Sequence, residues 1–268
     1  MRSAKSEKKS RRETKILVAN LEYGAQKTGL EPWLKLLHKE EENGKACDVL
    51  ILSETWTKRK YNSGRRLALQ KKFYWVGDYK SGLAIVSRWP LTLIGVGECF
   101  LTAHIPSRNL IVAVIHLPDF PYAPWQITGE PYCYSGECQP SLLSPKQAVT
   151  VAKQTRLPHL REALGSVEKE KGEKTKVVVA GDFNEPSHLD WTKAATKKGL
   201  VPAAIKFPCS VEMLTKTFKD AFRETWPDET TVLGYTWGPQ NVNKEKEKTE
   251  TKTNEKKKKR YLHKSKQI

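Results

Sequence analysis

A run of four apolar residues, 177–180, limits the possible fold of this chain more than any other stretch. Three of the four are valines, and such a run is typical of a strand buried on both faces of its sheet. We expect this strand to stop at Gly181, where the backbone can turn in a way that a Cβ would resist. Asp182 and Asn184 follow, and in an extended segment their side chains would point the same way. Such a pair could hold a water and a phosphoryl oxygen together, although Asp and Asn are also common at ordinary strand-to-turn junctions.

Three other apolar runs also end in a polar or ionisable side chain. The first ends in Asn20, the second in Glu54 and the third in His116. Taken alone, each has an ordinary interpretation as a turn cap, a surface acid or a hydrogen-bonded strand end. A random chain would seldom place such a group at the end of every core strand, so we expect the four strand ends to converge on one site.

Two carboxylates, two amides and one imidazole would meet in that site. A lone glutamate with amide and water oxygens suits a hard divalent ion such as Mg²⁺, which keeps water and takes up phosphate oxygens of a substrate. His116 could neutralise charge on a phosphate or give it a proton, and Asp182 could orient or deprotonate an attacking water.

Residues 118–140 are expected to form a long loop, rich in Pro, Tyr, Gly and Cys. Loops of this length tend to be functional or disordered, and the five aromatic residues in this one argue against disorder. Cys133 and Cys138 lie within it and could form a disulfide in an oxidising compartment or remain free thiols. Residues 144–164 predict a helix that begins at a Ser-Pro pair and is kinked or divided at Pro158.

The net charge of +17 is concentrated at the two ends of the chain. Residues 1–15 carry seven Lys/Arg against two Glu, and residues 241–268 carry eleven against four. The body is therefore only mildly basic, which gives weak support to nucleic-acid binding. We predict a disordered basic tail over residues 1–14, one domain over residues 15–240 and a disordered Lys/Glu-rich tail over residues 241–268.

The motifs, taken in chain order, resemble the endonuclease/exonuclease/phosphatase superfamily. They are Val-Ala-Asn20, Leu-Ser-Glu54, Ser-Gly-Leu-Ala-Ile-Val-Ser87, Val-Ile-His116-Leu and Gly-Asp182-Phe-Asn184-Glu-Pro. The resemblance extends from about Lys15 to Pro239, and Gly-Asp-Phe-Asn is its most specific part. Members of the superfamily include pancreatic-type deoxyribonucleases, apurinic endonucleases, neutral sphingomyelinases and inositol polyphosphate phosphatases. The resemblance implies an α/β fold, a four-layer sandwich of two packed mixed β-sheets flanked by helices.

The same resemblance implies a role for each residue of the site. Glu54 would be the ligand of Mg²⁺ or Mn²⁺, and Asn20 would assist the metal or the phosphate. His116 would contact the scissile phosphate, Asp182 would position the attacking water, and Asn184 would hydrogen-bond the charge that develops in the transition state. The implied activity is hydrolysis of phosphate esters, and nuclease-like cleavage of phosphodiesters is favoured.

One part of the family pattern is missing after Trp237. Members close with an Arg-Ile-Asp strand and a Ser-Asp-His motif, whereas this chain continues into Lys/Glu-rich sequence and His263, which has no Asp before it. We therefore expect the C-terminal strands of the fold to be missing, a sheet edge to be unpaired and activity to be weak or absent. The alternatives are a truncated, inactive relative that only binds phosphate-bearing ligands, or an enzyme of the phosphatase or sphingomyelinase type.

The expected partner is a phosphate-ester substrate, with nucleic acid as one candidate, and a monomer is the expected oligomeric state. No apolar run approaches the roughly 20 residues that a membrane span needs, so no integral membrane segment is expected. The sequence as given shows no signal peptide. The compartment stays open between secretion, which related members suggest, and the cytoplasm or nucleus.

Overall fold

The computed structural model describes residues 13–56, 61–134, 136–139 and 142–236. Residues 1–12 and 237–268 lie outside these ranges. Almost all of the predicted N-terminal tail and the whole predicted C-terminal tail, which includes His263, are therefore not described, and neither is Trp237. The chain forms two compact units, Met1–Lys219 and Asp220–Ile268. The domain boundaries proposed from the sequence remain a prediction.

The first sheet lies in the larger unit and has the strand order β1-β2-β4-β3. Its strands are β1 (Ile16–Asn20), β2 (Val49–Ser53), β3 (Tyr74–Asp78) and β4 (Leu83–Ser87). β1 pairs with β2 in parallel, and the other two pairings are antiparallel, so the sheet is mixed.

The second sheet, in the same unit, has the order β10-β7-β6-β5 and repeats this arrangement. Its strands are β5 (Thr92–Val96), β6 (Phe100–Ile105), β7 (Leu110–His116) and β10 (Lys176–Asp182). β10 pairs with β7 in parallel, and the remaining pairings are antiparallel. In the described part of the chain, β1 and β10 are therefore edge strands, and each is parallel to its neighbour.

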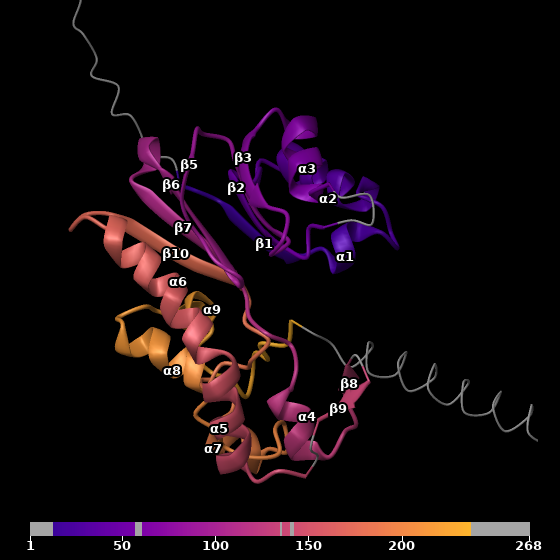
Figure 1. The fold of residues 1–268 in the computed structure, drawn as a ribbon. Coiled ribbons are helices and arrows are strands. Elements are labelled where there is room, and N and C mark those ends of the chain that lie inside the picture. Colours follow the sequence, from indigo (N-terminus) through magenta and orange to yellow (C-terminus); the bar gives the residue numbers. More distant parts are fainter. Residues whose placement is uncertain (1–12, 57–60, 135, 140–141, 237–268) are drawn as a thin grey trace, which may run out of the picture. The chain divides into compact units, whose positions relative to one another are not determined.

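Alternating side chains of the inner strands build the layers of the larger unit. Val49 and Ile51 of β2 pack with Val112 and Val114 of β7 in a fully buried core between the sheets. The intervening Leu50 and Leu52 face the other way, against α2 (Glu31–Glu42) and α3 (Ser63–Lys71). On the far side, α6 (Leu157–Glu170) covers the outer face of the second sheet (Figure 1). The four-layer sandwich of two mixed sheets is confirmed.

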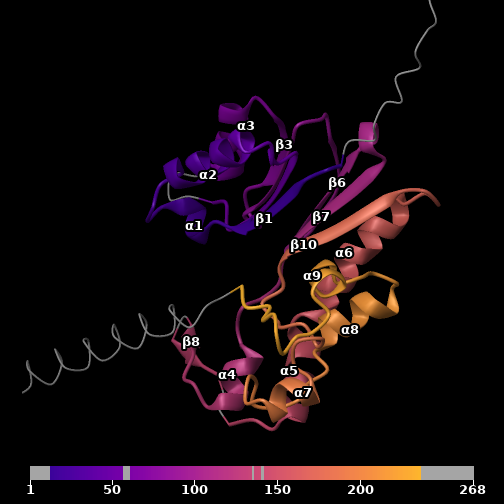
Figure 2. The same ribbon diagram turned by 180° about the vertical axis from the view of Figure 1, so that it is seen from behind.

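The remaining elements of the larger unit are mostly short. They are α1 (Glu22–Ala25), the 3₁₀ turn Pro106–Arg108, α4 (Ala123–Thr128), β8 (Cys133–Tyr134), β9 (Glu137–Cys138), α5 (Pro145–Thr155), α7 (Lys193–Lys197) and α8 (Pro208–Thr215). α5 ends just before Arg156 and α6 begins just after it, which confirms the divided helix expected around Pro158 (Figure 2). None of the helices in the described ranges has the length and apolarity that spanning a bilayer requires.

In the smaller unit, α9 (Ala221–Thr225) is capped by Asp220, whose carboxylate accepts hydrogen bonds from two backbone amides of the first turn. The buried Arg223 donates hydrogen bonds to the carbonyls of Trp226 and Val232, both at 2.9 Å. This arginine ties the segment after the helix back onto the helix.

β10 extends one residue beyond its expected end. The expectation that it stops at Gly181 is wrong, because Gly181 pairs with Ile115 and Asp182 pairs with His116 in the parallel ladder with β7. Gly181 has a φ of +139°, and a Cβ at this position would lie 2.0 Å from the carbonyl oxygen of Ile115. The glycine therefore allows the close approach of two strands up to the point where both end.

Replacing Gly181 with alanine should destabilise the protein by about 2 kcal/mol or more, because the Cβ meets backbone and the φ is strained for an L residue. The matched control is Gly165→Ala in α6, where a Cβ meets nothing within 4 Å and should stabilise the helix by about 0.5–1 kcal/mol. Urea unfolding of both variants measures the difference, and equal free energies of unfolding would contradict this account of β10.

Candidate active site

Strand register brings the expected site residues to one end of each sheet. Asn20 is the last residue of β1 and pairs with Ser53, so Glu54 follows directly beside it. In the second sheet, Asp182 and His116 are paired residues at the ends of β10 and β7. Parallel pairing places both members of each couple at the carboxyl ends of their strands, where the backbone leaves the sheet.

A single amide group joins the two sheets at this point. The Nδ2 of Asn20 donates to Glu54 Oε1 at 2.8 Å and to Asp182 Oδ2 at 3.0 Å. The other end of the same amide, Oδ1, accepts a 2.9 Å hydrogen bond from the backbone N–H of Glu22. Because a backbone N–H requires an acceptor, this bond fixes the amide with its NH₂ group toward the two carboxylates.

The Glu54 carboxylate is held on its other side by backbone. Its Oε2 accepts a 3.0 Å hydrogen bond from the N–H of Tyr23, and its carbonyl accepts one from Gly24. Glu54 has a φ of +50°, which is uncommon for a residue with a side chain and marks strained backbone of the kind that gathers at functional sites. The Nε2 of His116 lies 3.9 Å from Glu54 Oε1, so the imidazole faces the same small space.

Asn184 joins the group in a different way from the one expected. Its φ is +47°, so the segment after Asp182 is not extended as predicted. Its backbone N–H donates to Asp182 Oδ1 at 2.9 Å, and its side-chain Nδ2 donates to the carbonyl of Leu117 at 2.8 Å. Asn184 therefore orients the Asp182 carboxylate and ties the segment after β10 to the segment after β7.

An aromatic ring borders the imidazole, and a second ring borders the first. The ring of Trp56 lies 6.2 Å from that of His116 and 6.2 Å from that of Tyr23. Gly82 leaves room for the indole, since a Cβ there would lie 1.7 Å from Trp56 Cε3. Trp56 and Tyr23 were not predicted as site residues, although Trp56 follows Glu54 by only two positions.

Tyr122 is a further residue that the sequence did not single out. Burial raises the pKa of its phenol to about 12, and the nearby Asp182 carboxylate adds to the increase. Its backbone N–H donates to the side chain of Gln139, and its ring packs edge-on against Trp125. The only sequence signal for Tyr122 was the concentration of aromatic residues in the segment that contains it.

The segment 118–140 is more ordered than a long loop. Its described residues include α4 and the hairpin of β8 and β9, and Cys133 and Cys138 are joined by a disulfide across that hairpin. Phe120 and Trp125 both pack against Tyr132 with ring centres 5.6 and 5.0 Å apart. The three cysteines outside this segment, Cys47, Cys99 and Cys209, are free.

The donor set at the strand ends fits a hard divalent cation. Glu54 offers carboxylate oxygens, and Mg²⁺ is commonly held by one or two carboxylates together with substrate phosphates. Asn20 turns its NH₂ group toward Glu54 and its Oδ1 toward the Glu22 N–H, so in this orientation it would assist an ion by holding the Glu54 carboxylate. Nowhere in the part of the chain that the structure describes do three or more His, Cys, Asp or Glu side chains form a group able to hold a metal ion. A cation here would depend on water and substrate for the rest of its ligands.

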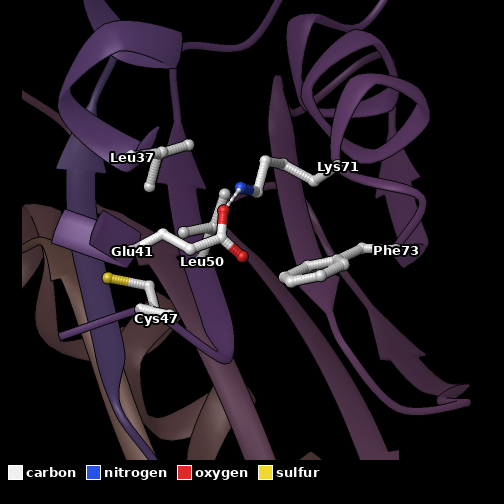
Figure 3. A pocket seen from close by; sticks show the side chains of 7 residues that line it. Leu37, Glu41, Cys47, Leu50, Lys71 and Phe73 are labelled. Atoms are coloured by element: carbon white, nitrogen blue, oxygen red, sulfur yellow. Dashed lines mark hydrogen bonds and ion pairs between the residues drawn. The ribbon is translucent and has the colours of Figure 1, made fainter. Parts of the chain in front are cut away.

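A small hollow elsewhere in the larger unit contains none of the site residues. It lies between α2, β2 and α3 and has a volume of about 10 Å³, room for roughly one water. Its lining includes Cys47 and the ion pair of Lys71 with Glu41 at 2.6 Å (Figure 3). This hollow offers no site for a substrate.

Comparison with known proteins identifies the family. Residues 17–243 match the model of the Endonuclease/Exonuclease/phosphatase family, and the chain belongs to that family. The resemblance inferred from the motifs is confirmed. The family description names hydrolases of phosphate esters.

Individual relatives are more distant. A stretch of 72 residues is 43% identical to Uncharacterized protein F14F9.5 of Caenorhabditis elegans, and it covers 27% of this chain and 23% of that protein. An AP endonuclease from Archaeoglobus fulgidus aligns with 17% identity and a TM-score of 0.47 over 81% of this chain and 76% of its own. Sphingomyelinase C from Streptomyces griseocarneus aligns with 17% identity and a TM-score of 0.36 over 65% of each chain.

Replacing Asn20 with aspartate should lower the free energy of unfolding by about 1–2 kcal/mol at pH 8, because a third carboxylate replaces the donor shared by two others. The loss should shrink at pH 5, since carboxylates that share a site take up a proton more readily. Thermal and urea unfolding at both pH values measure the effect. Gln70→Glu, on the exposed face of α3, adds the same charge as a control. A loss that is absent, or that is the same at both pH values, would count against the shared hydrogen bonds.

Proposed function

We propose that this protein hydrolyses phosphate esters with the help of a divalent metal ion, and that its preferred substrates are phosphodiesters. The observation that carries the proposal is the amide of Asn20, which brings a carboxylate from each sheet to one point beside an imidazole. Family membership supports the reaction class. A site of this kind combines an acid-base group, a cation-binding carboxylate and donors for a charged oxygen.

Glu54 would hold the ion, Mg²⁺ or Mn²⁺, and Asn20 would assist it by keeping the Glu54 carboxylate in place. When bound, such an ion polarises a phosphoryl oxygen and stabilises the charge that develops in the transition state. The protein's own contribution is to fix the Glu54 carboxylate by hydrogen bonds from Asn20 and from the Tyr23 amide. A carboxylate held at both oxygens loses little freedom when its substrate arrives.

Asp182 would orient the attacking water and accept its proton. Its Oδ2 is held by Asn20 and its Oδ1 by the backbone of Asn184, so the carboxylate plane is fixed. Each carboxylate oxygen retains a second lone pair after these bonds, and that lone pair can accept a hydrogen bond from water. The general base of a hydrolytic reaction requires this combination of fixed direction and free acceptor capacity.

His116 and Asn184 would act on the phosphate itself. His116 is the strand partner of Asp182 and faces Glu54, so its ring nitrogen can reach a phosphate oxygen between the two carboxylates. One amide proton of Asn184 is used by the Leu117 carbonyl, and the second is available for an oxygen whose charge grows in the transition state.

The rings beside the site favour a substrate that carries organic groups close to its phosphate. The ring of Trp56 adjoins His116, and Tyr23 is 53% exposed next to it. A phosphodiester carries an organic group on each side of the phosphorus, and these rings offer apolar and stacking surface to one of them. This supports phosphodiesters, nucleic acid among them, over small phosphomonoesters.

Glu54→Gln and Asp182→Asn should each reduce metal-dependent hydrolysis at least about 100-fold, because each removes a charge that the reaction uses while keeping side-chain size. The assay follows bis(p-nitrophenyl) phosphate and supercoiled plasmid in Mg²⁺ and Mn²⁺, and EDTA should abolish turnover. The control is Glu41→Gln, the same substitution in the hollow between α2 and α3, which should leave the rate unchanged.

Wild-type turnover that survives EDTA, or variants that retain full activity, would contradict the proposal. Binding of inorganic phosphate without turnover by the wild type would favour the inactive, phosphate-binding relative instead. Faster turnover of phosphomonoesters or sphingomyelin than of plasmid would move the substrate to the phosphatase or sphingomyelinase class.

A further inference from the structure

The turn that follows β1 is wound left-handed. Its four residues, Glu22, Tyr23, Gly24 and Ala25, have successive φ values of +46°, +54°, +67° and +59°. L residues usually adopt this conformation singly, because it is costly for every residue except glycine. Strained backbone of this kind gathers at functional sites and persists only where the surrounding contacts hold it.

Contacts with the site hold this turn. The N–H of Tyr23 donates to Glu54 Oε2 at 3.0 Å, and the N–H of Gly24 donates to the Glu54 carbonyl at 2.6 Å. From the other side, the Ser63 hydroxyl donates to the Gly24 carbonyl at 2.9 Å. The turn is therefore fixed to the residue that carries the strand-end carboxylate of the first sheet.

The turn presents an aromatic ring where the backbone favours another residue. Gly24 and Ala25 are buried, whereas Tyr23 is 53% exposed. Asparagine is among the residues with a side chain that tolerate a left-handed backbone best, so tyrosine at this position runs against local preference. An exposed ring on strained backbone, bonded to a carboxylate of the site, is typical of a ligand contact.

A neighbouring indole keeps the Tyr23 ring in place. The ring meets that of Trp56 edge-on, with the centres 6.2 Å apart and 77° between the planes. The indole is confined by Gly82, where a Cβ would lie 1.7 Å from it, and it borders the His116 ring at 6.2 Å. Tyr23 thus offers exposed aromatic surface to a group bound beside His116.

We propose that Tyr23 is a specificity-determining residue whose ring stacks on a nucleobase next to the phosphodiester at His116, and that the substrate is nucleic acid with an unpaired base at that point. The inference rests on the function proposed above and names the substrate of the same site. In a duplex, each base is covered by its neighbours in the stack, whereas an unpaired base can offer a face to an aromatic side chain. Stacking needs only that face, so the preference would be for single strands rather than for a sequence.

Positive charge lies along the same border. Trp56 and Asn62 form an antiparallel backbone bridge, and Asn62 caps α3, whose first turn carries the exposed Arg65 and Arg66. The helix dipole disfavours cations at this end, so neither arginine is there to stabilise the helix. The Arg66 guanidinium lies 5.6 Å from the centre of the Tyr61 ring. Cations beside aromatic rings are the combination that binds the backbone and the bases of a single strand.

The test separates the base from the phosphate. The ligands are a fluorescein-labelled oligothymidylate, a sugar-phosphate chain of the same length without bases, and a duplex of the same length. Binding is followed by fluorescence anisotropy in EDTA, so that metal-dependent cleavage does not compete, and hydrolysis of the same ligands is followed in Mg²⁺ and Mn²⁺.

Three variants and one control are compared. Tyr23→Asn suits the left-handed backbone and lacks a ring, Tyr23→Leu keeps an apolar side chain against Trp56, and Tyr23→Phe keeps the ring without its hydroxyl. The control is Tyr74→Asn at the first residue of β3, which is 52% exposed. Tyr74 pairs with Ser87 at the end of the first sheet opposite to Glu54.

Tyr23→Asn and Tyr23→Leu should each weaken binding of the oligothymidylate about tenfold, the effect of losing one base stacked on one ring. Binding of the base-free chain should change less than about twofold, because the contacts with its charges are unaltered. The ratio of kcat/KM between the two chains should fall in parallel. Tyr23→Phe and Tyr74→Asn should behave as the wild type, and if Tyr23→Asn unfolds, Tyr23→Leu decides the question.

An equal loss of affinity for both chains would overturn the proposal, because Tyr23 would then act on the sugar-phosphate backbone or only hold the turn. Unchanged binding in Tyr23→Asn and Tyr23→Leu, or tighter binding of the duplex than of the single strand by the wild type, would also overturn it. Hydrolysis of sphingomyelin vesicles that requires the ring, without base-dependent binding, would assign the ring to a lipid headgroup instead. Base-dependent binding through Tyr23 in a wild type without metal-dependent turnover would refute the proposed function alone and support this inference.

Discussion

The parallel pairing of β1 with β2 and of β10 with β7 is the constraint on which the site depends. In each sheet it brings two strand ends together and sends the chain out of the sheet at the same edge. The apolar core between the sheets then fixes the distance across which one asparagine amide can reach a carboxylate from each side. The direction of the strands therefore determines which chain positions meet at the site, and the residues at those positions determine its chemistry.

The two sheets repeat one arrangement, an edge strand parallel to its neighbour followed by two antiparallel strands. The repetition explains why the polar residues come in couples, Asn20 with Glu54 and His116 with Asp182. Each couple alone is a pair of neighbouring strand ends. The two couples come together because the sheets pack face to face. The dense core between the sheets then keeps the distance between the couples fixed.

The sequence predicted β1, β2, β7 and β10 and the convergence of the polar residues at their ends, because unbroken apolar runs and abrupt polar ends leave a strong local signal. β5 and β6 were not predicted, since Thr and Gly stand among the apolar residues of β5, and Thr and His among those of β6. The extended conformation expected through Asn184 was wrong: its φ is +47°, and its side chain bonds the carbonyl of Leu117, 67 positions away in sequence, a contact that a local pattern does not show. The burial of Arg156 could not be predicted, since a buried charge differs from an exposed one only through tertiary contacts.

The missing side chain at Gly82 limits how this family member can change. The indole of Trp56 occupies the volume that a side chain at position 82 would fill, so the ring beside His116 keeps its place because the turn before β4 carries a glycine there. A substitution there would leave every ionisable group of the site intact and still displace the ring that borders it. A change at position 82 would thus alter the surface that borders the site, although residue 82 itself takes no part in the reaction.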